Sequence, residues 1–359
     1  MSRALIAMSG GVDSSVAAHL MMEGGYECTG ITMKLFENED IGVGWERSCC
    51  SLKDSEDARQ VAEGMNMPFY ILNYSQEFNE QVIGRFIEAY KNGETPNPCI
   101  DCNRYIKFEQ LLNHARELHQ DYIVTGHYAR VEYSAEAGRY LLKKGVDESK
   151  DQSYVLYSLT QEQLAHTLFP LGAFRKTEVR EIARRHGFAN AQKHDSQDIC
   201  FVLDGDYPGF IQQYTGETFE KGRFVGVDGK DFGENKGIVH YTVGQRRGLG
   251  IAAPKPLYVC SISPEDNTVV IGERENLFSR SLVAKDVNLI AMEKLEGPVR
   301  VKAKVRYKQP EQPAVAEQLE DGTLRVTFDE PQRAISKGQA VVLYDGDVIV
   351  GGGTMCAVE

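Results

Sequence analysis

The residues with the clearest chemical potential lie near the start of the chain, at positions 9–15 (Ser-Gly-Gly-Val-Asp-Ser-Ser). This run follows an apolar segment at residues 4–8 and opens a helical pattern at residues 14–22. Two glycines allow a tight turn whose N–H groups point at an anion, and the positive end of a helix dipole favours phosphate. The hydroxyl groups can donate to phosphate oxygens, and Asp13 can hold Mg²⁺. A plain helix-capping turn uses the same residue types, but the complete run favours a nucleotide-phosphate site.

A second run with reactive potential, residues 95–103 (Thr-Pro-Asn-Pro-Cys-Ile-Asp-Cys-Asn), precedes a helical pattern at residues 105–119. Its two prolines restrict the backbone, so we expect a loop that is shaped before any ligand binds. Cys102 lies near the expected N-terminus of the helix, and Arg104 and Lys107 follow it closely. The helix dipole and both cations favour the thiolate, which is the reactive form of cysteine. Cys102 is therefore a candidate nucleophile.

The other cysteines stand in different contexts. Cys200 lies in the polar run at residues 195–201 (Asp-Ser-Gln-Asp-Ile-Cys-Phe), which makes it a second candidate reactive thiol. Cys99 and Cys102 have a spacing that suits a redox pair or metal ligands, but no second pair of this spacing exists and a four-cysteine zinc site is not expected. Three cysteines in apolar, strand-like runs are expected to pack in the core: Cys28, Cys260 and Cys356. Two cysteines of a polar loop stay unassigned: Cys49 and Cys50.

Short apolar runs alternate with helical patterns over the first 205 residues, as expected of a doubly wound, mostly parallel α/β sheet. The expected strands are residues 4–8, 28–33, 69–72 and 122–125, and the expected helices are residues 14–22, 55–63, 77–90 and 105–119. Glycines become frequent after residue 205, and after residue 280 short strands alternate with turns, the pattern of a small β-barrel. The sequence therefore predicts three domains: residues 1–205 with the phosphate loop, a small central domain at 206–280, and a C-terminal β-barrel at 281–359.

The composition is that of a folded protein. The chain has 359 residues, of which 42% are hydrophobic and 26% are charged, and no apolar run reaches the roughly 18 residues that span a membrane. The first residues carry no secretory apolar stretch, so we expect a cytoplasmic protein with reduced cysteines and no membrane partner. The net charge of −12 argues against unselective coating of nucleic acid, which requires a basic protein.

RNA binding by so acidic a chain needs a local basic patch, and residues 299–308 provide a candidate. The cations at alternate positions of this stretch are Arg300, Lys302, Lys304, Arg306 and Lys308. Alternate residues of a strand lie about 6.6–6.8 Å apart, so one face could follow a phosphate backbone, although the solvated face of a barrel strand often carries lysine as well. A second basic stretch, residues 175–186, is expected to be an amphipathic helix whose Lys176, Arg180 and Arg184 could meet RNA.

The phosphate run resembles the signature of the PP-loop ATP pyrophosphatases, which cleave ATP between its α and β phosphates and adenylylate a carbonyl-type oxygen. Further motifs occur in the order seen in the tRNA-specific 2-thiouridylase family, and this resemblance spans nearly the whole chain. The motifs are residues 95–103, 126–130 (Gly-His-Tyr-Ala-Arg), 150–154 (Lys-Asp-Gln-Ser-Tyr), 195–201, 244–248 (Gly-Gln-Arg-Arg-Gly) and 306–307 (Arg-Tyr). The resemblance implies a PP-loop domain, a small central domain and a C-terminal β-barrel.

The resemblance also implies roles for individual residues. Cys102 matches the family's catalytic nucleophile, and Cys200 matches the cysteine that carries incoming sulfur as a persulfide. The implied ATP-binding residues are Ala7, Met8, Ser9, Gly10, Gly11, Val12, Asp13, Ser14, Met33 and Gly126. The implied tRNA contacts are Asn97, Pro98, Cys99, Lys150, Asp151, Gln152, Arg306 and Tyr307. The implied positions for tRNA specificity are His127 and Gln339.

The implied reaction is ATP-dependent 2-thiolation of the wobble uridine, position 34, in the tRNAs for Lys, Glu and Gln. ATP with Mg²⁺ would adenylylate O2 of the uridine, and sulfur from the Cys200 persulfide would then displace AMP. Attack by Cys102 would leave a transient Cys102–Cys200 disulfide, and a sulfur-relay protein or a cysteine desulfurase would supply the sulfur. Cys99 stands where many relatives have Asp, so Cys99, Cys102 and Cys200 could instead hold a 4Fe–4S cluster with one iron open to sulfide.

Two other functions share parts of this pattern. A small-molecule, ATP-dependent amide ligase would share the phosphate run but would need neither Cys200 nor a basic strand. A non-enzymatic RNA-binding or sulfur-trafficking protein would keep the basic strand beside an inactive nucleotide loop. Replacement of Cys200 separates the ligase from a thiolase, and pyrophosphate release in the presence of tRNA and ATP separates the non-enzymatic protein.

Overall fold

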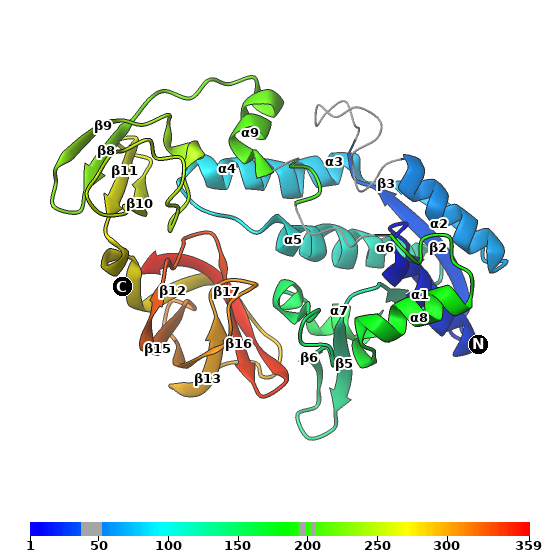
Figure 1. Cartoon of the computed structure of the whole chain (residues 1–359). Helices are drawn as coiled ribbons and strands as arrows, with labels where there is room; N and C mark the ends of the chain where they lie inside the picture. Colours follow the sequence, from blue (N-terminus) through cyan, green and yellow to red (C-terminus); the bar gives the residue numbers. More distant parts are fainter. Residues whose placement is uncertain (37–51, 194–198, 203–204) are drawn as a thin grey trace. The chain divides into compact units, whose positions relative to one another are not determined.

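The computed structural model describes residues 1–36, 52–193, 199–202 and 205–359. The chain forms two compact units (Figure 1). The first unit comprises residues 1–83, 99–205 and 346–349, and the second comprises residues 84–98, 206–345 and 350–359. Among the described residues, no helix combines the length and apolar character that crossing a membrane requires.

A parallel five-stranded sheet forms the centre of the first unit. Its strands are β1 (Arg3–Ala7), β2 (Glu27–Lys34), β3 (Phe69–Asn73), β4 (Tyr122–Val124) and β7 (Thr167–Leu168), in the order β3-β2-β1-β4-β7. This sheet confirms the predicted α/β class. The strand order reverses direction between β1 and β4, and open α/β sheets bind ligands at the carboxyl ends of the strands at such a point.

Three helices cover one face of this sheet: α1 (Val12–Glu23), α2 (Leu52–Gly64) and α8 (Lys176–Arg185). Alternate β1 residues, Ala4 and Ile6, are fully buried in one apolar cluster with these helices. Leu5 points to the opposite face and is also fully buried. Burial on both faces explains why β1 is continuously apolar in the sequence.

The two longest helical patterns of this part of the chain differ from the prediction. The expected helix at residues 77–90 is a composite of α3 (Ser75–Phe78), the π-helical η1 (Asn79–Gly84) and α4 (Arg85–Lys91). The expected helix at 105–119 begins seven residues earlier and consists of α5 (Pro98–Asp101), the π-helical η2 (Cys102–Gln110) and α6 (Leu111–Glu117). Proline suits the first helical position because no N–H partner is needed there. The predicted loop at 95–103 therefore ends at Pro98.

The remaining elements of the first unit follow β4. A hairpin of β5 (Ala129–Ser134) and β6 (Arg139–Lys144) carries the 126–130 motif at its start. Short helical segments then lead to β7 and α8: η3 (Ser153–Leu156), α7 (Gln161–Ala165) and η4 (Pro170–Ala173).

The second unit holds two β structures. The first is a four-stranded sheet in the order β10-β11-β8-β9, formed by β8 (Arg223–Gly226), β9 (Asp231–Glu234), β10 (Tyr258–Ser263) and β11 (Thr268–Gly272). It is accompanied by α9 (Tyr207–Thr215), η6 (Ile238–His240) and η7 (Arg274–Leu277). The second is a barrel of β12 (Phe278–Leu289), β13 (Val299–Lys304), β14 (Gln312–Gln318), β15 (Leu324–Arg333), β16 (Ala340–Asp345) and β17 (Val348–Val358), closed by pairing of β12 with β17. The predicted C-terminal β-barrel is confirmed.

The basic stretch at residues 299–308 is only partly a strand, because β13 ends at Lys304 and a turn follows. Tyr307 lies in this turn and is 38% exposed. Acidic residues also accompany the cations: Arg300 pairs with Asp329 on β15, and Lys304 lies 4.0 Å from Glu311. The alternation on one strand therefore extends only to Lys304, two of its cations have acidic neighbours, and contact of this stretch with RNA stays a prediction.

Candidate active site

The phosphate run forms the turn from β1 into α1, at the carboxyl edge of the sheet. Gly10 has a φ of +70°, and a Cβ there would overlap the carbonyl oxygen of Asp54, so only glycine fits. Gly11 caps α1 with an extended backbone, φ −88° and ψ 159°. The turn thus places the first N–H groups of α1 at its open end, as anion binding requires.

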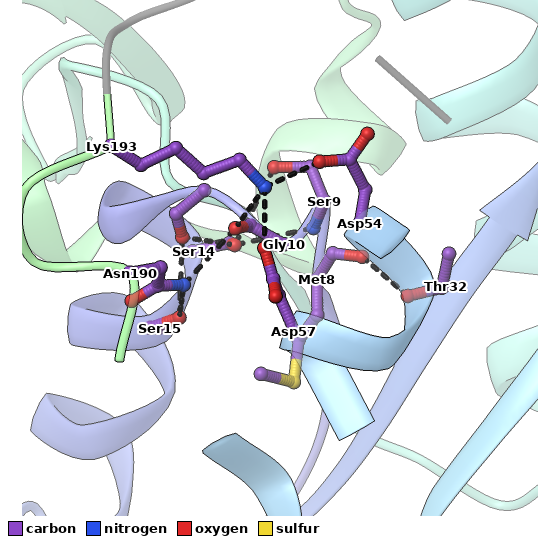
Figure 2. Close-up of polar contacts among 11 residues, drawn as sticks. Met8, Ser9, Gly10, Ser14, Ser15, Thr32, Asp54, Asp57, Asn190 and Lys193 are labelled. Carbon is purple, nitrogen blue, oxygen red and sulfur yellow. Dashed lines mark hydrogen bonds and ion pairs between the residues drawn. The ribbon is translucent and has the colours of Figure 1, made fainter. Parts of the chain in front are cut away.

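Serine side chains shape the inside of this turn (Figure 2). The Oγ of Ser14 accepts from the N–H of Ser9 at 3.2 Å and donates to the carbonyl oxygen of Gly11 at 3.0 Å. The Oγ of Ser9 lies 3.5 Å from the Oγ of Ser14, and Ser15 donates to the same Gly11 oxygen at 3.2 Å. The structure therefore brings together the serines and glycines that the sequence marked for ATP.

Lys193 adds a cation that no motif in the sequence indicated. Its Nζ lies 2.7 Å from a carboxylate oxygen of Asp57, bonds to Asp54, and donates to the carbonyl oxygen of Gly10 at 3.2 Å (Figure 2). Burial lowers the pKa of Lys193, but the hydrogen bonds and charges of the two carboxylates outweigh burial, so the net direction is upward. Lys193 therefore stays an ammonium ion beside the phosphate loop.

Asn190 fastens the same segment to the loop. Its Nδ2 donates to the carbonyl oxygen of Gly10 at 3.1 Å and to the Oγ of Ser15 at 2.9 Å (Figure 2). The segment after α8 thus contributes an amide and an ammonium group to a site that the sequence located only at residues 9–15. Asn190 and Lys193 are about 180 positions away from the loop in the sequence, so no local sequence pattern could link them to it.

Asp13 is held by two partners from other elements. Lys176 Nζ lies 2.7 and 2.8 Å from its carboxylate oxygens, and the hydroxyl of Tyr128 donates to it at 2.8 Å. Lys176 is 8% exposed, so the expectation that it meets RNA from a solvated helix face is wrong. Lys176 is the first residue of α8 and is buried together with Val179 and Ala183 of the same helix.

The other implied ATP residues line the switch point. A Cβ on Gly126 would lie 2.9 Å from the backbone of Asp13 and Ser14, so β4 approaches the loop as closely as glycine allows. Met8 is tied to β2 by hydrogen bonds to Ile31 and from Thr32, both 2.7 Å long. The remaining residues of the set lie on the same edge: Ala7 at the end of β1, Val12 at the start of α1 and Met33 near the end of β2.

The 150–154 motif joins the 126–130 motif by reciprocal hydrogen bonds. The side chain of Gln152 accepts from the N–H of Tyr128 at 3.0 Å, and the N–H of Gln152 donates to the Tyr128 carbonyl oxygen at 3.0 Å. Asp151 accepts from the N–H groups of Gly145 at 3.1 Å and Ser153 at 3.2 Å. Lys150, at the start of the motif, donates its N–H to Asp147. Because Tyr128 bonds to Asp13, this motif is linked to the phosphate loop.

His127 is a buried residue. Its Nδ1 lies 2.6 Å from the hydroxyl of Thr125, and the rings of Phe108 and Phe169 pack against it. Burial, followed by the charge of Lys107, lowers the pKa of His127 well below its usual value. His127 is therefore a neutral side chain between the Cys102-bearing helix and the sheet, and its role in tRNA specificity stays a prediction.

The candidate thiols lie in the first unit. Cys102 is 8% exposed and begins η2, whereas Cys99 is exposed one turn earlier, on α5. The side chain of Asn103 donates to the carbonyl oxygen of Val155 at 3.0 Å, which anchors this helix to η3. Cys102 was expected just before a helix, but it is the fifth residue of the composite helix that begins at Pro98. It starts the π-helical part of that helix, and π-helical segments are frequent at functional sites.

Cys200 is half-buried and precedes Phe201, whose ring packs edge-on against Phe78 at 5.8 Å. Residues 195–198 of its motif, and Cys49 and Cys50, lie outside the described residues. None of the described cysteines is in a disulfide. Cys28 is buried, as predicted for a packing residue, and burial raises its pKa to about 11. Cys260 on β10 and Cys356 on β17 are half-buried.

In the second unit, Gln339 lies beside the 95–98 segment. Its side chain donates to the carbonyl oxygen of Pro96 at 3.3 Å, next to Asn97 and Pro98, and the N–H of Thr95 donates to Lys337 at 2.8 Å. The structure thus brings together a residue of the barrel and implied base-contacting residues that are about 240 positions apart.

Arg306 connects two motifs of the second unit. Its Nη2 donates to the carbonyl oxygens of Val243 and Ala334, each at 3.0 Å, and lies 2.9 Å from the Oγ of Ser336. Val243 directly precedes the 244–248 motif, so Arg306 holds that motif beside the turn that carries Tyr307. Arg306 thus also has contacts within the protein, and its implied contact with tRNA stays a prediction.

Comparison with known proteins agrees with these features. Three family models match: the tRNA methyl transferase HUP domain at residues 2–204, the tRNA methyl transferase PRC-barrel domain at 208–273 and the aminomethyltransferase beta-barrel domain at 279–355. The chain is 51% identical over 351 residues to tRNA-specific 2-thiouridylase MnmA of Clostridioides difficile, covering 98% of this chain and 97% of that one. It is 52% identical over 354 residues to the protein of the same name from Moorella thermoacetica, covering 99% of both. This chain belongs to the tRNA-specific 2-thiouridylase family.

Proposed function

We propose that the protein is an ATP-dependent sulfurtransferase that converts the wobble uridine, position 34, of the tRNAs for Lys, Glu and Gln to 2-thiouridine. The observation that carries the proposal is a series of contacts within the first unit. The Cys102 helix is anchored by Asn103 to Val155, Val155 bonds to Gln152, Gln152 bonds to Tyr128, and Tyr128 bonds to Asp13 of the phosphate loop. A candidate nucleophile and a candidate ATP site are thus parts of one rigidly connected structure.

The residues of the loop fit ATP with Mg²⁺. The turn offers N–H and hydroxyl donors to phosphate oxygens, the carboxylate of Asp13 is a suitable ligand for Mg²⁺, and Lys176 and Lys193 supply positive charge within reach of the same turn. Bound Mg²⁺ would neutralise phosphate charge. We assign adenine contacts to Met33 and Gly126, at the carboxyl ends of β2 and β4, because ligands of such sheets bind there.

The proposed chemistry begins with attack of uridine O2 on the α-phosphate of ATP, which releases pyrophosphate and leaves an AMP ester on C2. The terminal sulfur of a Cys200 persulfide then bonds to C2, and AMP departs with the former O2. The Cys102 thiolate attacks the Cys200 sulfur, which breaks the S–S bond, leaves the terminal sulfur on the base and forms a Cys102–Cys200 disulfide. A thiol reductant regenerates both cysteines, and a sulfur-relay protein or cysteine desulfurase reloads Cys200.

We assign tRNA contacts to both units. In the first unit these are Cys99, Lys150, Asp151 and Gln152, of which Gln152 also supports Tyr128. In the second unit they are Asn97, Pro98 and Tyr307, with Gln339 as a specificity position beside Pro96. Arg306 takes part by holding the turn of Tyr307. In the alternative interpretation, Cys99, Cys102 and Cys200 would hold a 4Fe–4S cluster. Iron and sulfide analysis after anaerobic purification tests it.

The test is mass spectrometry of nucleosides from tRNA incubated with the protein, ATP, Mg²⁺, and a cysteine desulfurase with cysteine, which loads Cys200 with persulfide sulfur. We expect 2-thiouridine from the wild type, none from Cys102→Ala, and an unchanged yield from Cys260→Ala, a half-buried cysteine outside the first unit. Cys200→Ser should keep ATP cleavage to AMP and pyrophosphate but lose transfer from a persulfide donor. Consumption of ATP without sulfur in the tRNA, or ADP as the product, would refute the proposal and favour a ligase or a trafficking protein.

A further inference from the structure

The side of α1 that faces the end of α8 carries a cluster that the proposed reaction does not use. His19 and Glu23 lie four residues apart on α1 and therefore share a face, and His186 caps the C-terminal end of α8. One donor atom from each of the three side chains lies within 4.8 Å of the other two. In the described part of the chain, this is the one set of three His, Cys, Asp or Glu residues that meets this distance.

We propose that His19, Glu23 and His186 form a binding site for a divalent transition-metal ion, with Zn²⁺ as the best match. Two imidazoles and one carboxylate are a ligand set that Zn²⁺ accepts, with water in the fourth position. Bonds of about 2.0–2.1 Å in a tetrahedral site separate neighbouring donor atoms by about 3.3 Å. The Nε2 of His19 and the Oε1 of Glu23 are already 3.3 Å apart.

The surroundings favour a metal over a simple ion pair. The rings of His19 and His186 have centroids 3.9 Å apart, and two protonated imidazoles at that distance would repel each other. A metal ion between the two rings would remove this repulsion, because it binds the neutral form of each imidazole. His19 is only 14% exposed, whereas Glu23 is 61% exposed, so one ligand is fixed and another can move to complete the coordination.

The site lies at the opposite end of α1 from the phosphate loop. Lys176 and Asp13 join the N-terminal ends of α8 and α1, and the metal would join their C-terminal ends, since the two helices pack side by side (Figure 1). His19 is six residues beyond Asp13, which is about 9 Å along a helix. An ion there would fix the two helices that hold the loop without entering the loop itself.

The test is isothermal titration of the metal-free full chain with Zn²⁺ alone, followed by NMR of the histidine rings. The wild type should bind one equivalent of Zn²⁺ at this site, and His186→Ala should bind it about 100-fold more weakly or not at all. Loss of a metal ligand should weaken binding by more than loss of a residue that only supports a ligand. Glu23→Gln, at an exposed position, should weaken the same equivalent with little risk to folding. Any Zn²⁺ bound by cysteines is bound equally by the wild type and by each variant, so the difference between their titrations reports only the proposed site.

His114→Ala is the matched control. His114 lies 3.5 Å from Glu117 on α6, so it forms a histidine–carboxylate pair like that of His19 and Glu23 but on a different helix, and its loss should leave the titration unchanged. In the wild type, Zn²⁺ should shift the ring signals of His19 and His186 together. Equal Zn²⁺ affinity and stoichiometry in wild type, Glu23→Gln and His186→Ala, or ring signals that do not move, would overturn the proposal.

Discussion

The pair of Lys176 and Asp13 should be the strongest side-chain link between α1 and α8. Two short charged hydrogen bonds, 2.7 and 2.8 Å, join side chains that are 10% and 30% exposed. Exposed pairs contribute about 0.2–1 kcal/mol, whereas breaking a fully buried pair costs about 3–5 kcal/mol. The partial burial places this pair between these limits, so we expect Lys176→Met to reduce the free energy of opening α1 and α8 by about 2 kcal/mol.

A double-mutant cycle with Asp13→Asn separates the pair from its surroundings. Amide hydrogen exchange of α1 and α8 measures their local opening free energy, which suits a chain of two units better than one global value. The effects of the two substitutions on the opening free energy should be non-additive by about 2 kcal/mol, because each single variant already breaks the pair. Lys143→Met, which removes a pair with Glu132 of the same 2.7 Å length whose carboxylate is 61% exposed, should cost less than about 1 kcal/mol. A coupling below about 0.5 kcal/mol for Lys176 and Asp13 would refute the reasoning.

Three further outcomes follow from the structure. Gly10→Ala should abolish ATP binding in a filter or calorimetric assay, because its Cβ would overlap the Asp54 carbonyl oxygen. Gly138 also has a positive φ, +62°, but has open space around it, so Gly138→Ala should lower the free energy of unfolding in urea by only about 1 kcal/mol of backbone strain. Because the pKa of folded His127 is lowered, the unfolded chain gains a proton below about pH 6.5 that the folded chain does not bind. The free energy of unfolding should therefore decrease as the pH falls, by up to about 1.4 kcal/mol per pH unit. His127→Gln should flatten this slope in urea titrations at several pH values, and an unchanged slope would contradict burial of a neutral ring. Iodoacetamide at pH of about 8 should label exposed Cys99 well before Cys28, whose pKa is raised to about 11 by burial; equal labelling in peptide mass spectrometry would contradict the packing role of Cys28.

Local signals were sufficient for much of the fold. The apolar run of β1, the glycine turn and the start of α1 form one continuous segment, so their period and composition could be interpreted directly. The same holds for the C-terminal β-barrel, whose short strands are separated by regular turns. The start of the Cys102 helix was missed because a run with two prolines and polar residues resembles a loop. A proline is also favourable at the first position of a helix, so its presence does not distinguish a loop from a helix start.

Residues of the site that come from distant segments could not be predicted. Lys193 and Asn190 reach the loop from beyond α8. Lys176 was expected to meet RNA because the periodicity of the sequence shows a basic helix face but not which helix packs against it. The contacts of Arg306 could not be predicted for the same reason, since the carbonyl groups that bind it belong to other segments. Periodicity reports which side of an element is apolar; it carries no information on the partner of a charged side chain.

The charges around the phosphate loop lead to a prediction about how the proposed ATP site works. Three carboxylates, those of Asp13, Asp54 and Asp57, are matched there with two ammonium groups, those of Lys176 and Lys193, so these five side chains carry one net negative charge. A triphosphate would be repelled if both lysines stayed on their carboxylates. We predict that the lysines turn toward phosphate oxygens and that Mg²⁺ takes their place beside Asp13. ATP affinity measured by calorimetry should then rise with Mg²⁺ in the wild type and should depend less on Mg²⁺ in Asp13→Asn.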